Sequence, residues 1–253
     1  MTLLDVRDIE VRFGGVVALD GLSFTVGEQS ICALIGPNGA GKTTMFNVVS
    51  RLYEAQAGHV LFQGEDLLAK APHEIARLGV ARTFQNLALF PALTVLENVM
   101  VGAHTAGKVG FVRGMLRLGV GREERRLRES CRAILERLSL GHLADRPALG
   151  LPFGTLKRIE FARALAAEPT LLLLDEPANG LTHGEVDELG ATIREIRDQF
   201  DLSILLVEHH MSMVMSISDE IVVMDFGRKI AEGRPDEVRN DPKVIEAYLG
   251  TPA

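Results

Sequence analysis

The eight residues GPNGAGKT, at positions 36–43, decide the fold of this chain. They fit the pattern G-x-x-x-x-G-K-S/T. The run SICALIG (30–36) before them is apolar, as a buried strand is, and KTTMFNVVSRL (42–52) after them has the pattern of a helix. This arrangement predicts a phosphate-binding loop, because backbone N–H groups and the positive end of the helix converge on the same anion.

Each polar residue of this loop has an expected role toward a bound nucleotide. Lys42 is expected to reach the β- and γ-phosphates, and Thr43 to ligate Mg²⁺. The alternative, a glycine-rich turn with a surface lysine, is disfavoured by the strand and the helix on either side. The residues expected to contact the nucleotide are Gly36, Pro37, Asn38, Gly39, Ala40, Gly41, Lys42, Thr43 and Thr44.

Apolar runs alternate with helical patterns along much of the chain, which predicts an α/β core with a parallel sheet. The apolar runs lack polar alternation, as central parallel strands covered on both faces do. Besides 30–36, the expected strands are TLLLLD (170–175), SILLVE (203–208) and EIVVMD (220–225), and the expected helices after 42–52 are 157–168 and 184–200.

Two parts of the chain depart from this alternation. Residues 3–13 and 22–26 mix alternating and β-branched residues and predict two antiparallel strands. Residues 87–160 lack strand-like runs and contain helical stretches at 93–103 and 122–140. We interpret them as a helical subdomain inserted into an α/β core formed by 1–86 and 161–253.

Two carboxylates stand at the end of the expected strand TLLLLD (170–175). Asp175 is expected to hold Mg²⁺, and Glu176 to polarise an attacking water. Alternatively, the two acids could cap the next helix. The phosphate loop elsewhere in the same chain favours the first reading.

Two more polar residues stand at the ends of β-like runs. Gln85, in ARTFQN, could sense the γ-phosphate and its metal, with a surface glutamine as the alternative. His209 follows SILLVE, at the edge of the sheet where ligands of doubly wound folds bind. A lone histidine is more often structural, and His210 beside it leaves the assignment open.

In this order, the motifs resemble those of the nucleotide-binding subunit of an ABC transporter. The resemblance covers nearly the whole chain and implies a P-loop NTPase (RecA-like) core with an N-terminal antiparallel β region and an inserted helical subdomain. It implies ATP and Mg²⁺ as cofactors. The matches are Phe13 for the aromatic residue that stacks on adenine, 36–43 for Walker A, Gln85 for the Q-loop, LLLLDE for Walker B with its catalytic Glu176, NGLT (179–182) for the D-loop and His209 for the switch histidine.

Within that superfamily, the chain resembles the ATPase subunits of branched-chain amino-acid importers. The residues that carry this likeness are RTFQNLALFPALTVLENVMVGAH (82–104), 207–233 and PDEVRNDPKVIEAYLG (235–250). The likeness implies a second ATPase subunit, two permeases and, indirectly, a periplasmic solute-binding protein, with the chain bound peripherally to the cytoplasmic face of the inner membrane. It implies the solute only loosely, because related systems carry other amino acids, amides or urea.

The family's signature, LSGGQ or a form like LSYGQ, corresponds here to LPFGT, residues 151–155. Pro152 supplies neither a hydroxyl nor a backbone N–H, and Thr155 replaces glutamine. Gly154 and the helix N-terminus are still expected to face a phosphate held by the opposite subunit. Phe153, in the same turn, is also expected to contact that nucleotide. In the D-loop, Thr182 stands where the family has Asp or Asn. Both substitutions concern residues that act across the dimer interface. In such a dimer each ATP site is composite, because one subunit supplies the phosphate loop and the other the signature turn. We expect the composite site completed by LPFGT to hydrolyse ATP more slowly.

Composition narrows the class of protein further. The 253 residues are 47% hydrophobic, and their formal net charge of -7 argues against a general nucleic-acid binder. No apolar run approaches the roughly 20 residues of a membrane span, so we expect a cytosolic chain. Two cysteines, Cys32 and Cys131, have no metal-ligand or disulfide spacing and are expected to be bystanders.

Other functions remain as alternatives. Between Lys108 and Arg137 the chain has nine basic and four acidic residues, which indicates a solvated helix face or a contact with permeases or lipid headgroups. A non-transport ABC module, such as a soluble regulator or a nucleic-acid-associated ATPase, would keep the same nucleotide motifs. A simple P-loop kinase is disfavoured by Gln85, Glu176 and His209 together.

Overall fold

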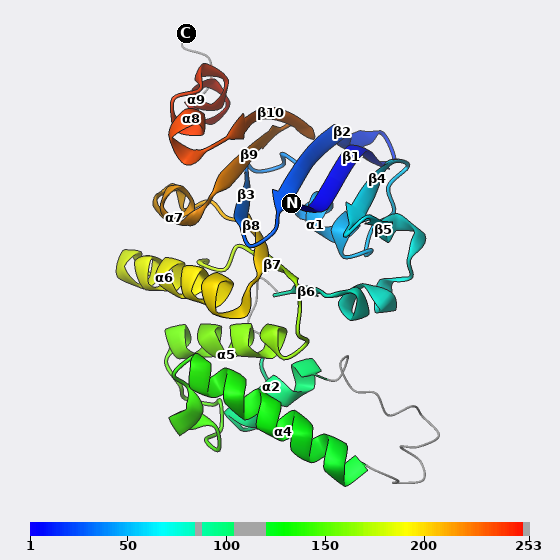
Figure 1. The fold of residues 1–253 in the computed structure, drawn as a ribbon. Helices are drawn as coiled ribbons and strands as arrows, with labels where there is room; N and C mark the ends of the chain where they lie inside the picture. The colour runs from blue at the N-terminus through cyan, green and yellow to red at the C-terminus, as the bar shows by residue number, and fades with distance from the viewer. Residues whose placement is uncertain (84–87, 104–119, 250–253) are drawn as a thin grey trace. The chain divides into compact units, whose positions relative to one another are not determined.

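A computed structural model describes residues 1–83, 88–103 and 120–249, without the side chains of 120–123 and 249 (Figure 1). The chain divides into two compact units. The first unit comprises Met1–Ile75 and Thr170–Ala253, and the second comprises Ala76–Pro169. The second unit is longer at both ends than the helical subdomain expected at 87–160.

Four strands of the first unit's larger sheet follow the expected runs: β3 (Ile31–Ile35), β7 (Leu171–Asp175), β8 (Ser203–Val207) and β9 (Glu220–Asp225). β10 (Arg228–Gly233) pairs with β9 at the edge of the sheet. The strand order is β10-β9-β3-β8-β7 (Figure 1). β3 pairs in parallel with β8 and β9, and β7 pairs in parallel with β8. The predicted parallel sheet is therefore confirmed, and every residue of β3, β7 and β8 is buried.

A second sheet of this unit is antiparallel. Its strands are β1 (Thr2–Phe13), β2 (Val16–Gly27), β4 (Ala57–Phe62) and β5 (Glu65–Asp66), in the order β2-β1-β4-β5. β1 and β2 confirm the predicted antiparallel pair, although β2 begins six residues before the expected 22–26. β4 and β10 were not predicted, because half-exposed strands lack the long apolar runs of the central ones.

Helices of the first unit pack on these sheets. Their bounds are α1 (Lys42–Val49), α6 (His183–Phe200), α7 (Met211–Ile217), α8 (Pro235–Arg239) and α9 (Pro242–Leu249). α1 contacts β2 of one sheet and β7 of the other. It stops at Val49, before the expected end at 52, because Arg51 adopts a left-handed conformation with φ of 58°.

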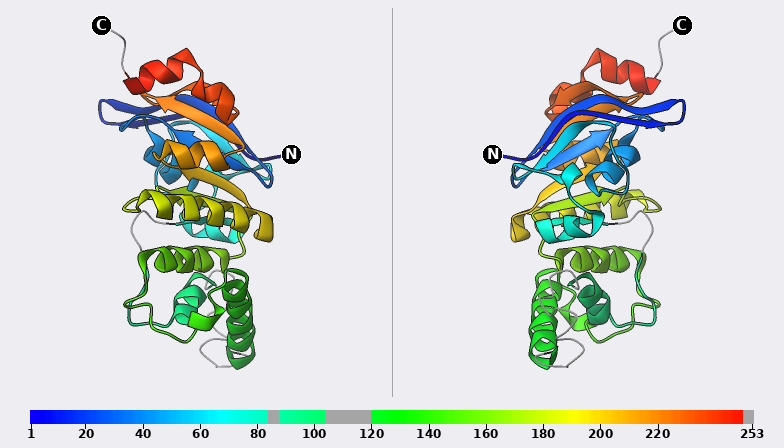
Figure 2. Two further views of the ribbon diagram at one scale, coloured as in Figure 1. Left: turned by 90° about the vertical axis from the view of Figure 1, so that its left-hand side faces the viewer. Right: turned by 90° about the vertical axis from the view of Figure 1, so that its right-hand side faces the viewer.

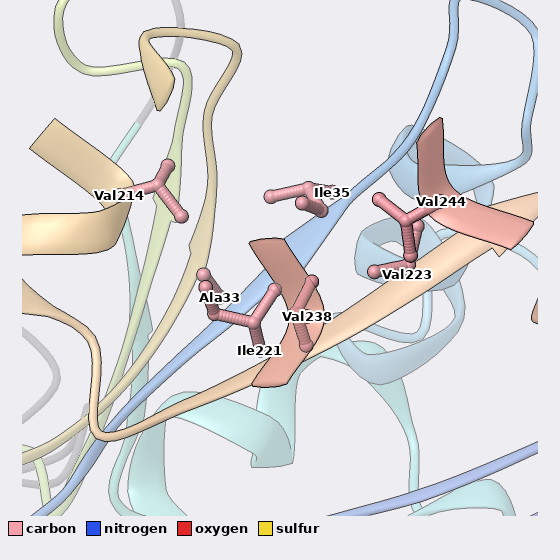
Figure 3. Close-up of a cluster of buried hydrophobic side chains, with 7 residues drawn as sticks. All are labelled: Ala33, Ile35, Val214, Ile221, Val223, Val238 and Val244. Atoms are coloured by element: carbon pink, nitrogen blue, oxygen red, sulfur yellow. The ribbon is translucent and has the colours of Figure 1, made fainter. Parts of the chain in front are cut away.

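A buried apolar cluster joins α7, α8 and α9 to the parallel sheet. In Figure 3, side chains of β3 and β9 meet one side chain from each of the three helices. These short C-terminal helices were not predicted. Packing on the sheet holds them in place, since helices this short are marginal alone in water. The cluster consists of Ala33, Ile35, Val214, Ile221, Val223, Val238 and Val244.

The second unit is mainly helical. Its described residues include β6 (Val80–Arg82), α2 (Val95–Gly102), α4 (Val120–Arg137) and α5 (Phe153–Leu165), and Figure 2 shows α2, α4 and α5 packed together. Gly102 explains the close approach of α2 to α5, because a Cβ there would lie 1.9 Å from the Arg163 carbonyl oxygen. None of the helices within the described residues has the length and apolarity of a membrane-spanning helix.

Both cysteine thiols are buried, Cys32 on β3 and Cys131 on α4. Burial raises the pKa of both thiols, that of Cys131 to about 11. Because the thiolate is the reactive form, we expect Ellman's reagent at pH 8 to leave the folded protein unlabelled within minutes and to label both thiols in guanidinium chloride. Rapid labelling of either cysteine in the folded chain would contradict the prediction that both are bystanders.

Candidate active site

The phosphate loop lies between β3 and α1, where the backbone needs glycine. Gly36, Gly39 and Gly41 have φ angles of 152°, 85° and 102°, which L side chains rarely adopt. A Cβ on Gly36 would lie 2.1 Å from the Met224 carbonyl oxygen, and one on Gly41 would lie 2.5 Å from that of Ala18. The loop is therefore held close to β9 and β2. Its glycines are required by the fold as well as by any ligand.

Lys42 begins α1 and lies under this loop, with 8% of its surface exposed. Its Nζ donates hydrogen bonds to the carbonyl oxygens of Gly36 (2.8 Å) and Pro37 (2.9 Å). Burial lowers the pKa of Lys42, and the negative charges of Glu176 and Asp175 oppose that shift. The lysine therefore lies within electrostatic reach of both acids at the end of β7.

The two acids stand at the carboxyl end of β7. Asp175 is the last residue of the strand and is buried, whereas Glu176 is partly exposed. Glu176 has a φ of 45°, and its N–H donates to the Val207 carbonyl oxygen at 2.8 Å. This bond ties the turn after β7 to the end of β8, since Asp175 and Val207 are partners in the parallel ladder.

Parallel pairing brings three distant segments to one edge of the sheet. The phosphate loop follows β3, the two acids stand at the end of β7, and Glu208, His209 and His210 follow β8. Because these strands run parallel, their carboxyl ends share an edge, which is where ligands bind in open α/β sheets. The side chain of His209 is 56% exposed there, and its ring centroid lies 4.4 Å from that of His210.

Glu208 was missed in the sequence analysis. Its side chain is completely buried. One carboxylate oxygen accepts hydrogen bonds from the N–H groups of His209 (2.8 Å) and His210 (3.2 Å), and it lies 2.9 Å from His210 Nδ1. The other oxygen accepts from the Ala178 N–H at 3.0 Å. The available signal was an acid directly after a strand that is apolar except for its first residue, Ser203, because a buried carboxylate requires partners.

Phe13 ends β1 and is 47% exposed. Its ring meets that of Tyr53 edge to face, with centroids 5.1 Å apart and an angle of 71° between the rings. Tyr53 was not singled out in the sequence analysis. The pair presents aromatic surface of the kind that a flat base can stack on.

Within the second unit, LPFGT forms the start of α5. The helix begins at Phe153, earlier than the expected 157–168. Pro152 is the N-cap residue and its side chain makes no cap hydrogen bond. The first turn's hydrogen bond runs from Leu156 N–H to the Pro152 carbonyl oxygen at 3.0 Å. The N–H groups of Phe153, Gly154 and Thr155 precede it, and such first-turn groups lack intrahelical partners.

Thr182 is the N-cap residue of α6 and forms a capping box with Glu185. Its N–H and hydroxyl donate to the Glu185 carboxylate at 2.9 and 2.7 Å. These two bonds lower the pKa of Glu185, and the hydroxyl bond is the larger cause. A helix cap therefore accounts for the threonine locally. Gln85 lies outside the described residues.

Comparisons with known proteins agree with this geometry. A family model described as ABC transporter matches residues 19–179. The chain belongs to the ABC transporter family. A second model, described as branched-chain amino acid ATP-binding cassette transporter, matches residues 228–253 of this ABC protein. The prediction that the chain is an ATP-binding, ATP-hydrolysing member of the family is thereby confirmed.

Full-length relatives are found in bacteria and archaea. The high-affinity branched-chain amino acid transport ATP-binding protein BraF of Pseudomonas aeruginosa is 41% identical, with 98% of each chain covered. LivG of Escherichia coli K12, with the same description, is also 41% identical over 98% of each chain. A probable LivG of Archaeoglobus fulgidus is 39% identical over 99% of this chain and 96% of that protein.

Solved structures show the same fold. A nucleotide-free ATP-binding cassette from an ABC transporter is 34% identical, with a TM-score of 0.85 over 99% of this chain and 100% of that one. An ATP-binding cassette in its ADP conformation is also 34% identical, with a TM-score of 0.86 over the same shares of the two chains. The predicted P-loop NTPase fold is confirmed.

Proposed function

We propose that this chain is the ATPase subunit of an importer for amino acids, branched-chain or otherwise hydrophobic. The observation that carries the proposal is the meeting of Lys42, the two acids and His209 at one edge of the parallel sheet. The choice of solute is supported by the relatives named for branched-chain amino acid transport and by the C-terminal family match. The chain acts with a second ATPase subunit and two permeases, bound peripherally at the cytoplasmic face of the membrane.

The loop residues fit a nucleotide's phosphates. The glycine turns leave backbone N–H groups accessible, since Asn38 and Gly39 are exposed. Lys42 exchanges its bonds to the two loop carbonyls for bonds to phosphate oxygens. The base stacks on Phe13, as the exposed ring allows.

A hydroxyl and a carboxylate suit Mg²⁺, which prefers oxygen ligands. Thr43 is exposed in the first turn of α1, and Asp175 closes β7, so these two residues would hold the ion. Gln85, which the resemblance also assigns to the metal, lies outside the described residues. A bound Mg²⁺ would supply charge neutralisation at the phosphate oxygens. Glu176 accepts a proton from the attacking water, and His209 orients the reacting groups beside it.

The signature LPFGT lacks the family's serine and glutamine, so we expect one composite site to hydrolyse ATP slowly. In a head-to-tail dimer, the start of α5 faces the γ-phosphate of the opposite subunit, and Pro152 leaves that phosphate without a hydroxyl donor. A hydrogen bond to a charged group contributes about 1.5–3 kcal/mol. We therefore expect Pro152→Ser combined with Thr155→Gln to raise hydrolysis at that site about tenfold, and the turnover of the whole complex by up to about twofold, because the other composite site is already active.

The control for this gain is Leu149→Ser, because Leu149 is 75% exposed just outside the turn. Steady-state phosphate release from the assembled complex measures both variants. Unchanged turnover in the double variant would contradict a weakened site.

Transport itself is tested by co-purification and reconstitution. The tagged chain should retain two permeases, and vesicles containing that complex should take up a branched-chain amino acid only with ATP and the solute-binding protein. Uptake of an amide or urea instead would reassign the solute. A chain that hydrolyses ATP but never retains a permease would be a non-transport ABC module.

A further inference from the structure

One buried carboxylate connects the two turns that carry Glu176 and His209. Glu208 spans them because one of its oxygens accepts from Ala178 N–H (3.0 Å), two residues after Glu176, and the other accepts from His209 N–H (2.8 Å). Glu176 N–H donates separately to the Val207 carbonyl oxygen at 2.8 Å. The turn after β7 is thus attached to the end of β8 by backbone and by side chain.

Burying this carboxylate is costly unless its oxygens are fully hydrogen-bonded. A neutral side chain of the same size would pack in the same space without that cost. Three backbone N–H groups and the ring of His210 satisfy the charge here. The donors come from both turns, so the carboxylate keeps its partners only while the two turns hold their present spacing.

We propose that Glu208 is a positioning residue that sets the distance between Glu176 and His209 during ATP hydrolysis. This inference rests on the catalytic roles of Glu176 and His209 in the proposed function. Glu208 is buried beneath the turns and acts through their backbone. Its contact with His210 Nδ1 also orients the N-cap residue of α7.

The main test is Glu208→Gln in the full-length chain, assembled with its permeases. A glutamine amide offers one acceptor oxygen, and its NH₂ group would face an N–H of either the Ala178 turn or the His209 turn. Because displacement of about 1 Å in an active site can cost about 10²-fold, we expect kcat to fall by between about 10-fold and 100-fold. We expect the Kd for ATP to stay within about threefold, since the phosphate loop keeps its contacts.

A double-mutant cycle separates positioning from general destabilisation. If Glu208 acts through His209, Glu208→Gln should reduce kcat much less in a His209→Ala background than in the wild type. A purely structural role would instead lower kcat in proportion to the number of ATP-binding sites. The effects of Glu208→Gln and His209→Ala on the free energy of activation would then be additive. Additive effects, or a kcat within threefold of the wild type, would overturn the inference.

Two further variants complete the design. Glu220→Gln makes the same change at the start of β9, at the other end of the sheet, and should leave kcat within about twofold. In Glu208→Asp the side chain keeps the charge but is too short to reach both turns. This variant tests the inference by the same criteria if the glutamine variant does not fold.

A wild-type complex without ATPase activity would refute the proposed function itself, whereas an active wild type with an equally active Glu208→Gln would refute only this inference.

Discussion

Glu176→Gln is expected to lower the rate of ATP hydrolysis by about 10² to 10⁴-fold, the range typical of a lost general base. The glutamine fills the same space and leaves the backbone bond to Val207 in place, so the turn keeps its shape. ATP binding should persist, because Lys42 and the glycine loop are unchanged. Phosphate release under saturating ATP measures the rate, and a fluorescent nucleotide measures the affinity.

Two comparisons sharpen that result. Glu188→Gln alters an exposed acid on α6 and should leave the rate within about twofold. In a heteromeric complex, Glu176→Gln should cost more activity than the same change in the partner, because the partner's acid would work opposite the weakened LPFGT turn. Equal losses from the two subunits would refute this asymmetry, and an active Glu176→Gln chain would refute its role as the base.

Lys42→Met should raise the Kd for ATP by at least about 50-fold. The lysine is buried, so methionine of similar length preserves the packing of α1 while removing the charge. Bonds from a charged donor to phosphate contribute about 1.5–3 kcal/mol each, which corresponds to roughly 10- to 150-fold per bond. Calorimetric titration with ATP and Mg²⁺ gives the affinity.

The control for Lys42 is Lys243→Met on α9, an exposed lysine outside the phosphate loop. Its Kd should match that of the wild type. Thermal unfolding of both variants shows whether affinity is lost at constant stability. ATP binding within threefold of the wild type in Lys42→Met would remove the lysine from the site.

Much of the fold was predictable because the central strands are chemically distinctive. β3, β7 and β8 are buried along their whole length, so their sequences contain almost nothing but apolar residues. β4 and β10 were missed because exposure on one face mixes polar residues into their sequences. The short helices α7 and α8 were missed because tertiary packing, which no local pattern records, stabilises them.

The candidate site was predictable to the extent that its residues occur in short motifs. The phosphate loop, the two acids and His209 each follow an apolar strand, and the structure brings these three segments to one edge. The start of α5 was placed too late, because Pro152 and Gly154 weaken a helical pattern that in fact begins at Phe153. The roles of these residues toward the nucleotide remain predictions.

The sequence by itself determined which chemical groups are available: a glycine loop with a lysine, two acids after a strand, and a histidine pair. Local periodicity and motif spacing are enough for that. Only the tertiary structure decided that Glu208 joins the turn after β7 to the turn after β8. The physical reason is that parallel strand register depends on backbone hydrogen bonds between segments about 30 residues apart, such as Asp175 with Val207. Glu208 acquires its Ala178 partner from that register, whereas its bonds to His209 and His210 are local in the sequence.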